Sequence, residues 1–401
     1  MSKRSLYKLF YIDNNEHKLE YEKRFNSEDT IHLDIMIGDD PAFFEQTAEL
    51  YKLAASIERT DKIINNLEHS LPDQAINQFA MRCLIDEIML TNNIEGVSST
   101  RKEIDEVLSN LSNKDKKLRF KGLVTKYAML IKNMNITISS CEDIRVIYDD
   151  IFLDEIKESD PDDLPDGEIF RKKSVSVFSA TEKEIHQGIM PESKIIETMD
   201  KSLKILHNDN IEVLFRIALF HYLFGYIHPF YDGNGRTSRF ISSYLLSQTL
   251  NPLIGYRISY TIKENIKHYY DAFKICNHPN NKGDLTPFIE MFLGIVDTSE
   301  KQLCNALEER KNKLDYYNDA VLKLPDNNDK NIMELYHLLI QAALFSDKGI
   351  STKELEETLK ISYNTVKRRL ETIPSNFITK KYYKKQNYYM IDLEEIDNYL
   401  R

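Results

Sequence analysis

Residues 228–239 read His228-Pro229-Phe230-Tyr231-Asp232-Gly233-Asn234-Gly235-Arg236-Thr237-Ser238-Arg239, and this stretch decides the fold around it. The run before it, residues 211–226, is rich in Leu, Ile and Phe and predicts a buried helix that Pro229 and the two glycines end. A second helix is expected to open near Arg236, because apolar residues recur on one face from Phe240 onward. The sequence therefore predicts two core helices joined by a glycine loop.

The Gly-Asn-Gly turn in this loop favours an anion. At a helix N-terminus the N–H groups of Gly233 and Gly235 point at a ligand, and Asn234 can add a side-chain donor. Arg236 and Arg239 lie three positions apart, so both project from one side of the first helical turn and can clamp phosphate oxygens. The turn and the two arginines together indicate a polyphosphate site.

Two further side chains complete a catalytic set. Asp232 is placed to hold Mg²⁺ against phosphates, since hard cations prefer oxygen ligands. The ordinary pKa of His228 is about 6.5, so its neutral form can accept a proton from an attacking hydroxyl. A histidine near a helix end is usually structural, and a Gly-Asn-Gly is usually only a turn. Their combination in one segment favours catalysis.

The segment resembles the Fic family signature, H-P-F-x-D-G-N-G-R-x-x-R, at every defined position. The resemblance implies that a Tyr, Thr or Ser hydroxyl of a target protein, or of the chain itself, attacks the α-phosphate of ATP. It also implies a role for each residue: His228 as base, Asp232 as Mg²⁺ ligand, Asn234 with the amides of Gly233 and Gly235 as α-phosphate hole, and Arg236 and Arg239 as β- and γ-phosphate clamps. Another nucleotide donor stays open, because some relatives use one.

The segment at 175–190 predicts a short exposed hairpin. In the Fic family such a flap covers the site and docks the target protein by β-augmentation, and its residues Val175, Ser176, Val177 and Phe178 would then border the nucleotide. An ordinary surface hairpin is the simpler interpretation of the same pattern.

Tyr269, Tyr270 and Asn277 resemble the family's adenine pocket, where an aromatic ring packs the base and an amide contacts its edge. Aromatic pairs on helices more often belong to a core. Since adjacent residues point to different faces of a helix, Tyr270 is the better candidate of the two tyrosines.

Thr91-Asn92-Asn93-Ile94-Glu95-Gly96 ends a helix expected over about 74–96, with Gly96 after its last turn. The pattern resembles the family's inhibitory motif, [S/T]-x-x-x-E-[G/N], which Thr91, Glu95 and Gly96 match. The resemblance implies that Glu95 pairs with Arg239 and so denies that arginine to the γ-phosphate. In some relatives this glutamate also supports removal of AMP, which stays open for this chain.

The expected fold is mainly α, with a helical core, a β-hairpin flap, an N-terminal helical region and a C-terminal winged helix-turn-helix. A short β-hairpin within 6–36, with strands expected over 6–11 and 18–21, precedes the N-terminal helices. We assign 1–150 to an N-terminal region with the inhibitory helix, 151–300 to the catalytic core, 301–328 to a linker helix, and 329–401 to the winged helix. Helices are also expected over 263–276, 287–297 and 300–322.

The winged-helix unit has helix-turn-helix spacing around residues 350–370 and a β-rich stretch after it. It holds 12 Lys and Arg against 11 Asp and Glu, which gives a net charge of +1. Because the whole chain has a net charge of −11, the remaining residues carry −12. One alternative function is therefore a DNA-binding regulator whose Fic core only modulates DNA binding. The other interpretation is that the winged helix serves for protein docking or dimerisation.

Composition limits the remaining choices. Hydrophobic residues make up 42% of the 401 residues and charged residues 29%, as in an ordinary globular protein. No apolar run approaches the roughly 18 residues of a membrane span, and the first residues lack an apolar signal-peptide stretch, so we expect a cytoplasmic protein. The four widely spaced cysteines suggest neither a zinc site nor a disulfide framework. DNA and a second copy of the chain stay open as partners.

Overall fold

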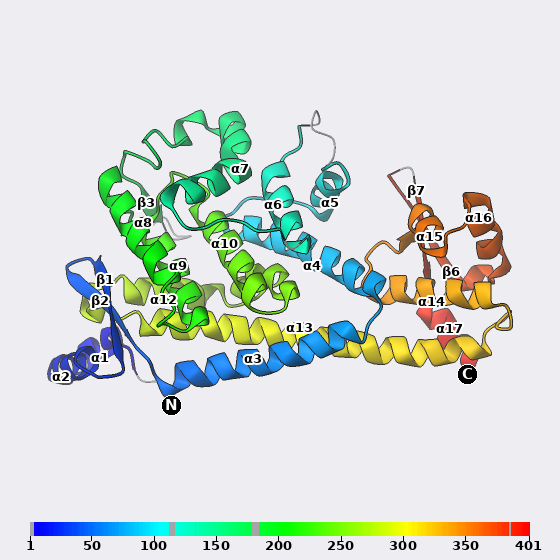
Figure 1. Ribbon diagram of the computed structural model, residues 1–401, viewed down its shortest axis with the longest axis horizontal. Coiled ribbons are helices and arrows are strands. Elements are labelled where there is room, and N and C mark those ends of the chain that lie inside the picture. The colour runs from blue at the N-terminus through cyan, green and yellow to red at the C-terminus, as the bar shows by residue number, and fades with distance from the viewer. Residues whose placement is uncertain (1–3, 112–116, 133, 179–183, 385) are drawn as a thin grey trace. The chain divides into compact units, whose positions relative to one another are not determined.

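The computed structural model describes residues 4–111, 117–132, 134–178, 184–384 and 386–401. The chain divides into two compact units. The first comprises residues 1–61 and 84–301, and the second comprises 62–83 and 302–401. The expected domain boundaries at 150, 300 and 328 stay predictions. Figure 1 shows that both units are built mainly from helices, which confirms the expected fold class.

Helices and a few short strands follow one another along the chain. Up to the flap the elements are α1 (Leu6–Ile12), α2 (Asn14–Phe25), β1 (Thr30–Ile37), β2 (Asp40–Glu45), α3 (Ala48–His69), α4 (Asp73–Ile94), α5 (Arg101–Ser109), α6 (Lys121–Ile131), α7 (Cys141–Ser159), β3 (Ser176–Phe178) and β4 (Glu184–Gln187). Then follow α8 (Glu192–Leu206), α9 (Val213–Ile227), α10 (Asn234–Thr249), α11 (Ile258–Glu264), α12 (Ile266–Cys276), α13 (Thr286–Ala320), α14 (Lys330–Phe345), β5 (Ile350–Ser351), α15 (Thr352–Leu359), α16 (Tyr363–Thr372), β6 (Ile378–Tyr383), β7 (Gln386–Ile391) and α17 (Leu393–Leu400).

Helix α9 is the centre of the first unit. It lies against α8 and α10, as Figure 1 shows, and nearly all of its side chains are buried. A helix that is apolar on every side has to be enclosed, because burial of its side chains supplies most of its stability. Its N-terminus is capped by Glu212, whose carboxylate accepts from the N–H of Phe215 at 3.0 Å. The buried helix thus gives the following loop a fixed starting point.

The N-terminal hairpin was predicted at the wrong residues. The runs 6–11 and 18–21, interpreted as strands, form α1 and α2, and the hairpin is made by β1 and β2 instead. The aromatic residues in these runs favour strands locally, but Leu6 and Leu9 are spaced to bury one helical face. Ser5 and Asp13 cap the two helices with their side chains.

Two other helix boundaries also differ from expectation. The helix expected over 263–276 is divided at Asn265 into α11 and α12. The helices expected over 287–297 and 300–322 form one continuous helix, α13. Its polar residues at the expected break have partners, since the Thr298 hydroxyl donates to the Gly294 carbonyl at 2.8 Å and the Ser299 hydroxyl to that of Thr261 at 2.6 Å. The helix therefore continues through them.

The last part of the second unit contains a small three-stranded sheet in the order β5-β7-β6, with α14, α15, α16 and α17. Ser351 and Glu354 form a capping box at the start of α15, and Ser362 caps α16. The winged-helix assignment of this part stays a prediction. In the described part of the chain, no helix combines the length and the apolar character that a bilayer crossing needs.

Two glycines on helices give opposite predictions for stability. A Cβ on Gly122 of α6 would lie 2.3 Å from the carbonyl oxygen of Asp150 and 2.4 Å from that of Ile151 on α7, whereas a Cβ on Gly294 of α13 would meet nothing within 4 Å. Gly122→Ala should lower the free energy of unfolding by about 1–3 kcal/mol, because the two helices must separate. Gly294→Ala should raise it by about 0.5–1 kcal/mol. Thermal unfolding midpoints of the two variants check this, and equal midpoints would contradict the packing of α6 on α7.

Candidate active site

His228 ends α9 in the left-handed conformation, with φ +53° and ψ +62°. Its N–H still donates to the Phe224 carbonyl at 3.0 Å, and its ring Nδ1 lies 3.3 Å from the Gly225 carbonyl oxygen. A carbonyl only accepts, so Nδ1 carries the ring proton and Nε2 keeps its lone pair. Nε2 is therefore the atom that can take a proton from a substrate.

Burial sets the protonation state of this ring. The pKa of His228 is lowered to about 4, mainly by burial and to a smaller extent by His186 and Arg171, while the bond to Gly225 and the Glu95 carboxylate oppose the change. The imidazole is thus neutral at pH 7 and ready to act as a base. Phosphates bound nearby would raise its pKa, because negative charge favours the protonated ring.

The glycine loop is held by its own side chains. Asn234 spans it, since its Nδ2 donates to the Phe230 carbonyl at 2.8 Å and its Oδ1 accepts from the Phe230 N–H at 3.0 Å. The Phe230 ring stacks on Tyr148 with centroids 3.6 Å apart. Gly233 has a φ of +78°, which favours glycine. In this structure the Asn234 amide braces the loop, and its predicted contact with a phosphate stays a prediction.

The first arginine of the motif, Arg236, lies between two carboxylates. Its guanidinium donates to Glu155 Oε1 at 2.9 Å and to Asp232 Oδ2 at 3.1 Å, and it lies 4.4 Å from the centre of the Phe152 ring. Glu155 was missed in the sequence, because nothing in the spacing of α7 connects it with a residue 81 positions later. Asp232 is half exposed, so it stays accessible to a ligand.

The second arginine, Arg239, is occupied by the end of α4. Its Nε donates to Thr91 Oγ1 at 2.8 Å, and one of its terminal nitrogens lies 3.0 Å from the Thr91 carbonyl and 2.7 Å from Glu95 Oε1. Burial alone would lower the pKa of Arg239, but the Glu95 carboxylate, together with Tyr269 and Tyr270, holds that pKa above its ordinary value. Gly96 has a φ of +75° just after the helix. The structure thus places two residues of the predicted inhibitory motif, Thr91 and Glu95, against Arg239.

The Glu95 carboxylate also covers the anion loop. A Cβ built on Gly235 would lie 2.1 Å from Glu95 Oε1 and 3.0 Å from an Arg239 terminal nitrogen. A carboxylate oxygen and a phosphate oxygen make the same charge-assisted hydrogen bonds to a guanidinium. The place beside the loop where an anion would bind is therefore filled by an anion of the chain itself.

The predicted adenine-pocket residues lie on or just after α12. Tyr269 is buried and its hydroxyl lies 2.8 Å from His221 Nε2, whereas Tyr270 is 41% exposed. Asn277 Oδ1 accepts from the Tyr222 hydroxyl at 2.7 Å. Burial lowers the pKa of His221 to about 3, so this ring is neutral. Tyr269 thus belongs to a buried polar network, and the exposed Tyr270 is the one that can contact a base.

The predicted flap is a hairpin of β3 and β4, with Ser176 opposite Gln187 and Val177 opposite His186. The carbonyl of Val175 accepts from the N–H of Gly188 at 2.9 Å. Residues 179–183 of the predicted flap lie outside the described residues, as do the side chains of Val177 and Phe178. The hairpin is confirmed, and its role toward a nucleotide stays a prediction.

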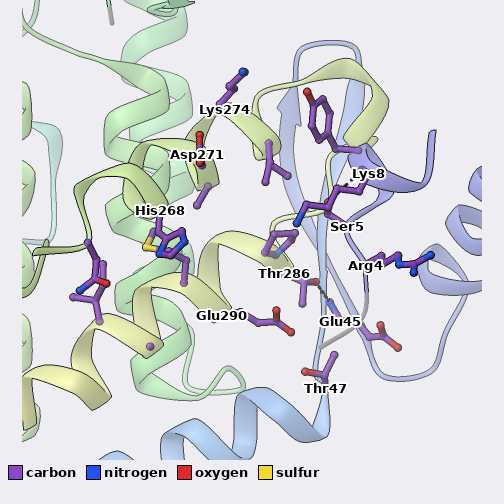
Figure 2. Close-up of a pocket in the computed structure, with 18 of the residues that line it drawn as sticks. Arg4, Ser5, Lys8, Glu45, Thr47, His268, Asp271, Lys274, Thr286 and Glu290 are labelled. Carbon is purple, nitrogen blue, oxygen red and sulfur yellow. Dashed lines mark hydrogen bonds between the residues drawn. The ribbon is translucent and has the colours of Figure 1, made fainter. Parts of the chain in front are cut away.

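A separate cavity of about 800 Å³ lies on another face of α12. Figure 2 shows His268, Asp271 and Lys274 of α12 beside it, with Glu45 and Thr47 at the end of β2. The residues that line this cavity do not include Tyr269, Tyr270 or any residue of 228–239. The cavity carries charges of both signs and is not part of the motif loop.

The residues at the loop fit a magnesium ion that arrives with a nucleotide. Among the described residues, no group of three His, Cys, Asp or Glu side chains forms a ready-made metal site. Asp232 offers one half-exposed carboxylate beside the loop. Protein sites for Mg²⁺ often supply only one or two carboxylates, with phosphates and water as the other ligands.

The fold and the loop define a helical domain with a glycine turn, a candidate anion site, between helices α9 and α10. Residues 138–246 match the model of the Fic/DOC family. The protein adenylyltransferase Fic of Drosophila melanogaster is 35% identical over 109 residues, which are 27% of this chain and 20% of that protein. The corresponding protein of Drosophila erecta is 37% identical over 108 residues, 26% of this chain and 19% of that protein. The chain thus spans about a fifth of these curated relatives.

A solved structure of a Fic family protein from Desulfovibrio desulfuricans G20 is similar in fold. It is 19% identical, has a TM-score of 0.51, and covers 87% of this chain and 97% of that one. Residues 138–246, which carry the loop, therefore match a Fic domain, and the likeness to this solved structure concerns the fold alone.

The protonation state of His228 can be measured directly. At pH 5 an ordinary histidine is mostly charged, but the ring of His228 should remain neutral because its pKa is about 4. Histidine ring NMR between pH 8 and 5 should show no change at His228. Glu95→Gln should lower the titration midpoint of the His228 ring further, since the Glu95 carboxylate raises the pKa of His228. A midpoint near 6.5 would contradict the buried ring.

Proposed function

We propose that this chain is a protein adenylyltransferase that moves AMP from ATP to a Tyr, Thr or Ser hydroxyl of a target protein or of itself. In this reaction the hydroxyl oxygen forms a bond to the α-phosphorus, and the bond from that phosphorus to the bridging oxygen of the β-phosphate breaks. The hydroxyl proton passes to His228 Nε2, and pyrophosphate leaves. Nearly all of the catalysis would come from positioning and charge neutralisation.

The residues of the loop would each hold one part of the nucleotide. The N–H groups of Gly233 and Gly235 would contact the α-phosphate at the N-terminus of α10. Arg236 and Arg239 would bind the outer phosphates, and Tyr270 would pack the adenine. Asp232 would hold Mg²⁺, which supplies neutralisation of the leaving pyrophosphate when bound. Both Drosophila relatives are named protein adenylyltransferase Fic, which supports this assignment.

The position of Glu95 is the observation that carries the proposal. Its carboxylate lies 2.7 Å from Arg239 and directly against Gly235. An arginine bound to a carboxylate of its own chain cannot hold a γ-phosphate at the same time. ATP would then bind without a productively placed α-phosphate, so the enzyme would be inhibited at rest.

The strength of this inhibition follows from the contact. A hydrogen bond between charged groups contributes about 1.5–3 kcal/mol, so release of Glu95 would raise productive binding by about 10- to 150-fold. Thr91 fixes Arg239 through two further bonds of 2.8 Å and 3.0 Å, but it is neutral and carries no competing charge. Glu95 is thus the group that competes with phosphate.

Transfer of the α-phosphate label tests both roles. Glu95→Gly should raise self-labelling from ATP labelled at the α-phosphate by about 10- to 150-fold. Asn93→Gly adds the same backbone freedom at the exposed end of α4 and keeps Glu95, so it should label at the native rate. His228→Ala in the Glu95→Gly chain should abolish labelling. An unchanged rate in Glu95→Gly would remove the inhibition model, and label entering only from the γ-phosphate would replace AMP transfer by phosphate transfer.

The flap is the proposed docking place of the target protein. A two-stranded hairpin with an exposed edge can add a strand from a partner chain, which would bring a target hydroxyl toward His228. Removal of AMP by the same site is an alternative, in which Glu95 positions a water. If modified protein loses its label when Glu95 is present but keeps it in Glu95→Gly, the result would favour that alternative.

A second candidate function rests on the last part of the chain. Helix α16 exposes Lys367 and Arg368, and β6 exposes Lys380 and Lys381. Basic residues on a second helix and a wing suit the phosphates of DNA. The chain would then be a DNA-binding regulator whose DNA binding is modulated by its Fic core. The competing alternative is that the same residues serve for protein docking or dimerisation.

A gel-shift series decides between these two roles. If α16 binds DNA, native protein should shift duplex DNA at low salt, and affinity should fall steeply between about 50 and 200 mM salt because phosphate contacts release counterions. Lys367→Ala with Arg368→Ala should weaken the shift, whereas Lys311→Ala on α13 should not. No shift at low salt would favour protein docking or dimerisation.

A further inference from the structure

Arg171 is a completely buried arginine just before the flap. Its guanidinium donates to three main-chain carbonyls: Nε to His228 at 2.8 Å, and the two terminal nitrogens to Lys173 at 2.6 Å and to Ile189 at 2.9 Å. Burial lowers the pKa of Arg171 from its ordinary value. A buried charge is costly, so these bonds have to stabilise it in place.

The three carbonyls belong to the two ends of the flap and to the catalytic loop, which must stay close together for the proposed reaction. Lys173 leads into the flap, Ile189 leaves it, and His228 carries the proposed base. Main-chain bonds follow the same connection: the N–H of Arg171 donates to Pro229 at 3.2 Å, and the N–H of Ile189 donates to Ile227 at 3.1 Å. One side chain thus ties both ends of the flap hairpin to the catalytic loop.

Gly188 leaves the space that this side chain needs. A Cβ at that position would lie 2.3 Å from a terminal nitrogen of Arg171 and 3.0 Å from the Cβ of His228. Real Cβ atoms are not found that close to another heavy atom, so an alanine would displace the guanidinium. Gly188→Ala is therefore a second way to disturb the same contacts without changing any charge.

We propose that Arg171 is a positioning residue that fixes the flap relative to His228, so that a target strand on the flap meets the base in the correct register. The inference rests on the proposed AMP transfer for its role in catalysis. It assigns no contact with ATP to Arg171, because its described hydrogen bonds all go to the main chain.

The flap and the nucleotide should therefore respond differently to loss of this contact. In the Glu95→Gly background, Arg171→Met should lower the turnover of AMP transfer by about 100-fold, since small displacements of reacting groups have effects of that size. ATP affinity should change by less than about threefold, because the groups that hold phosphate are untouched. Arg171→Lys, which cannot reach all three carbonyls, and Gly188→Ala should show the same pattern with smaller losses.

The pH dependence separates geometry from charge. The charged and titratable groups that act on the His228 ring are His186 on the flap, Arg171, and Glu95 at the end of α4. Loss of the Arg171 charge should raise the pKa of His228. In the pH profile of turnover, the acid limb should therefore move to higher pH in Arg171→Met. Arg171→Lys keeps the charge and should leave the limb in place while turnover falls. A role in overall stability alone predicts no such difference.

Hydrogen exchange tests the connection without any catalysis. The amides of Gly188 and Ile189 donate to Val175 and Ile227, so both should exchange faster in Arg171→Met and in Gly188→Ala. Arg145→Met is the matched control, because Arg145 bonds the Ile169 carbonyl at 2.8 Å outside the flap. It should leave both amides protected.

The outcomes are distinguishable. Unchanged exchange at Gly188 and Ile189, or equal turnover with native and substituted Arg171, would overturn the positioning role. Absence of any AMP transfer in the Glu95→Gly parent would overturn the proposed function instead, and the exchange measurement would still decide whether Arg171 holds the flap.

Discussion

A buried guanidinium has to find anionic or carbonyl partners, and the requirement of Arg239 organises this site. The side chain is 1% exposed, and its partners include Thr91 and Glu95 at the end of α4. Since the same guanidinium is the second arginine of the loop, any phosphate that binds there must compete with the carboxylate. The end of helix α4 is therefore part of the candidate active site although it lies far upstream in the chain.

The geometry of the loop follows from two left-handed positions. His228 at φ +53° ends α9, and Gly233 at φ +78° begins α10, so the chain turns back within a few residues. A non-glycine residue in this conformation is strained, and such strain is tolerated where the surroundings fix the backbone. Asn234 and Phe230 fix it from within, and Arg171 holds the His228 carbonyl from outside. These contacts hold the backbone on both sides of His228, the proposed base.

Sequence patterns predicted the features whose residues are close together or belong to a motif. The glycine loop and the β3–β4 hairpin follow from local spacing, whereas the pairing of Glu95 with Arg239 was implied only by the resemblance of residues 91–96 to a family motif. Glu155 and Arg171 could not be found, because their partners are an arginine 81 positions away and three main-chain carbonyls, which leave no mark in the sequence. The N-terminal helices were misinterpreted because aromatic residues favour strands locally, whereas burial of Leu6 and Leu9 decides the structure.

We propose that the Glu95 carboxylate holds an AMP-transferring site inactive. The most direct test is the intact mass of purified Glu95→Gly protein after incubation with ATP and Mg²⁺, beside the native chain treated in the same way. We predict that the variant gains the mass of one AMP group while the native chain remains mostly unmodified. A gain of phosphate mass, or equal modification of both proteins, would contradict this claim.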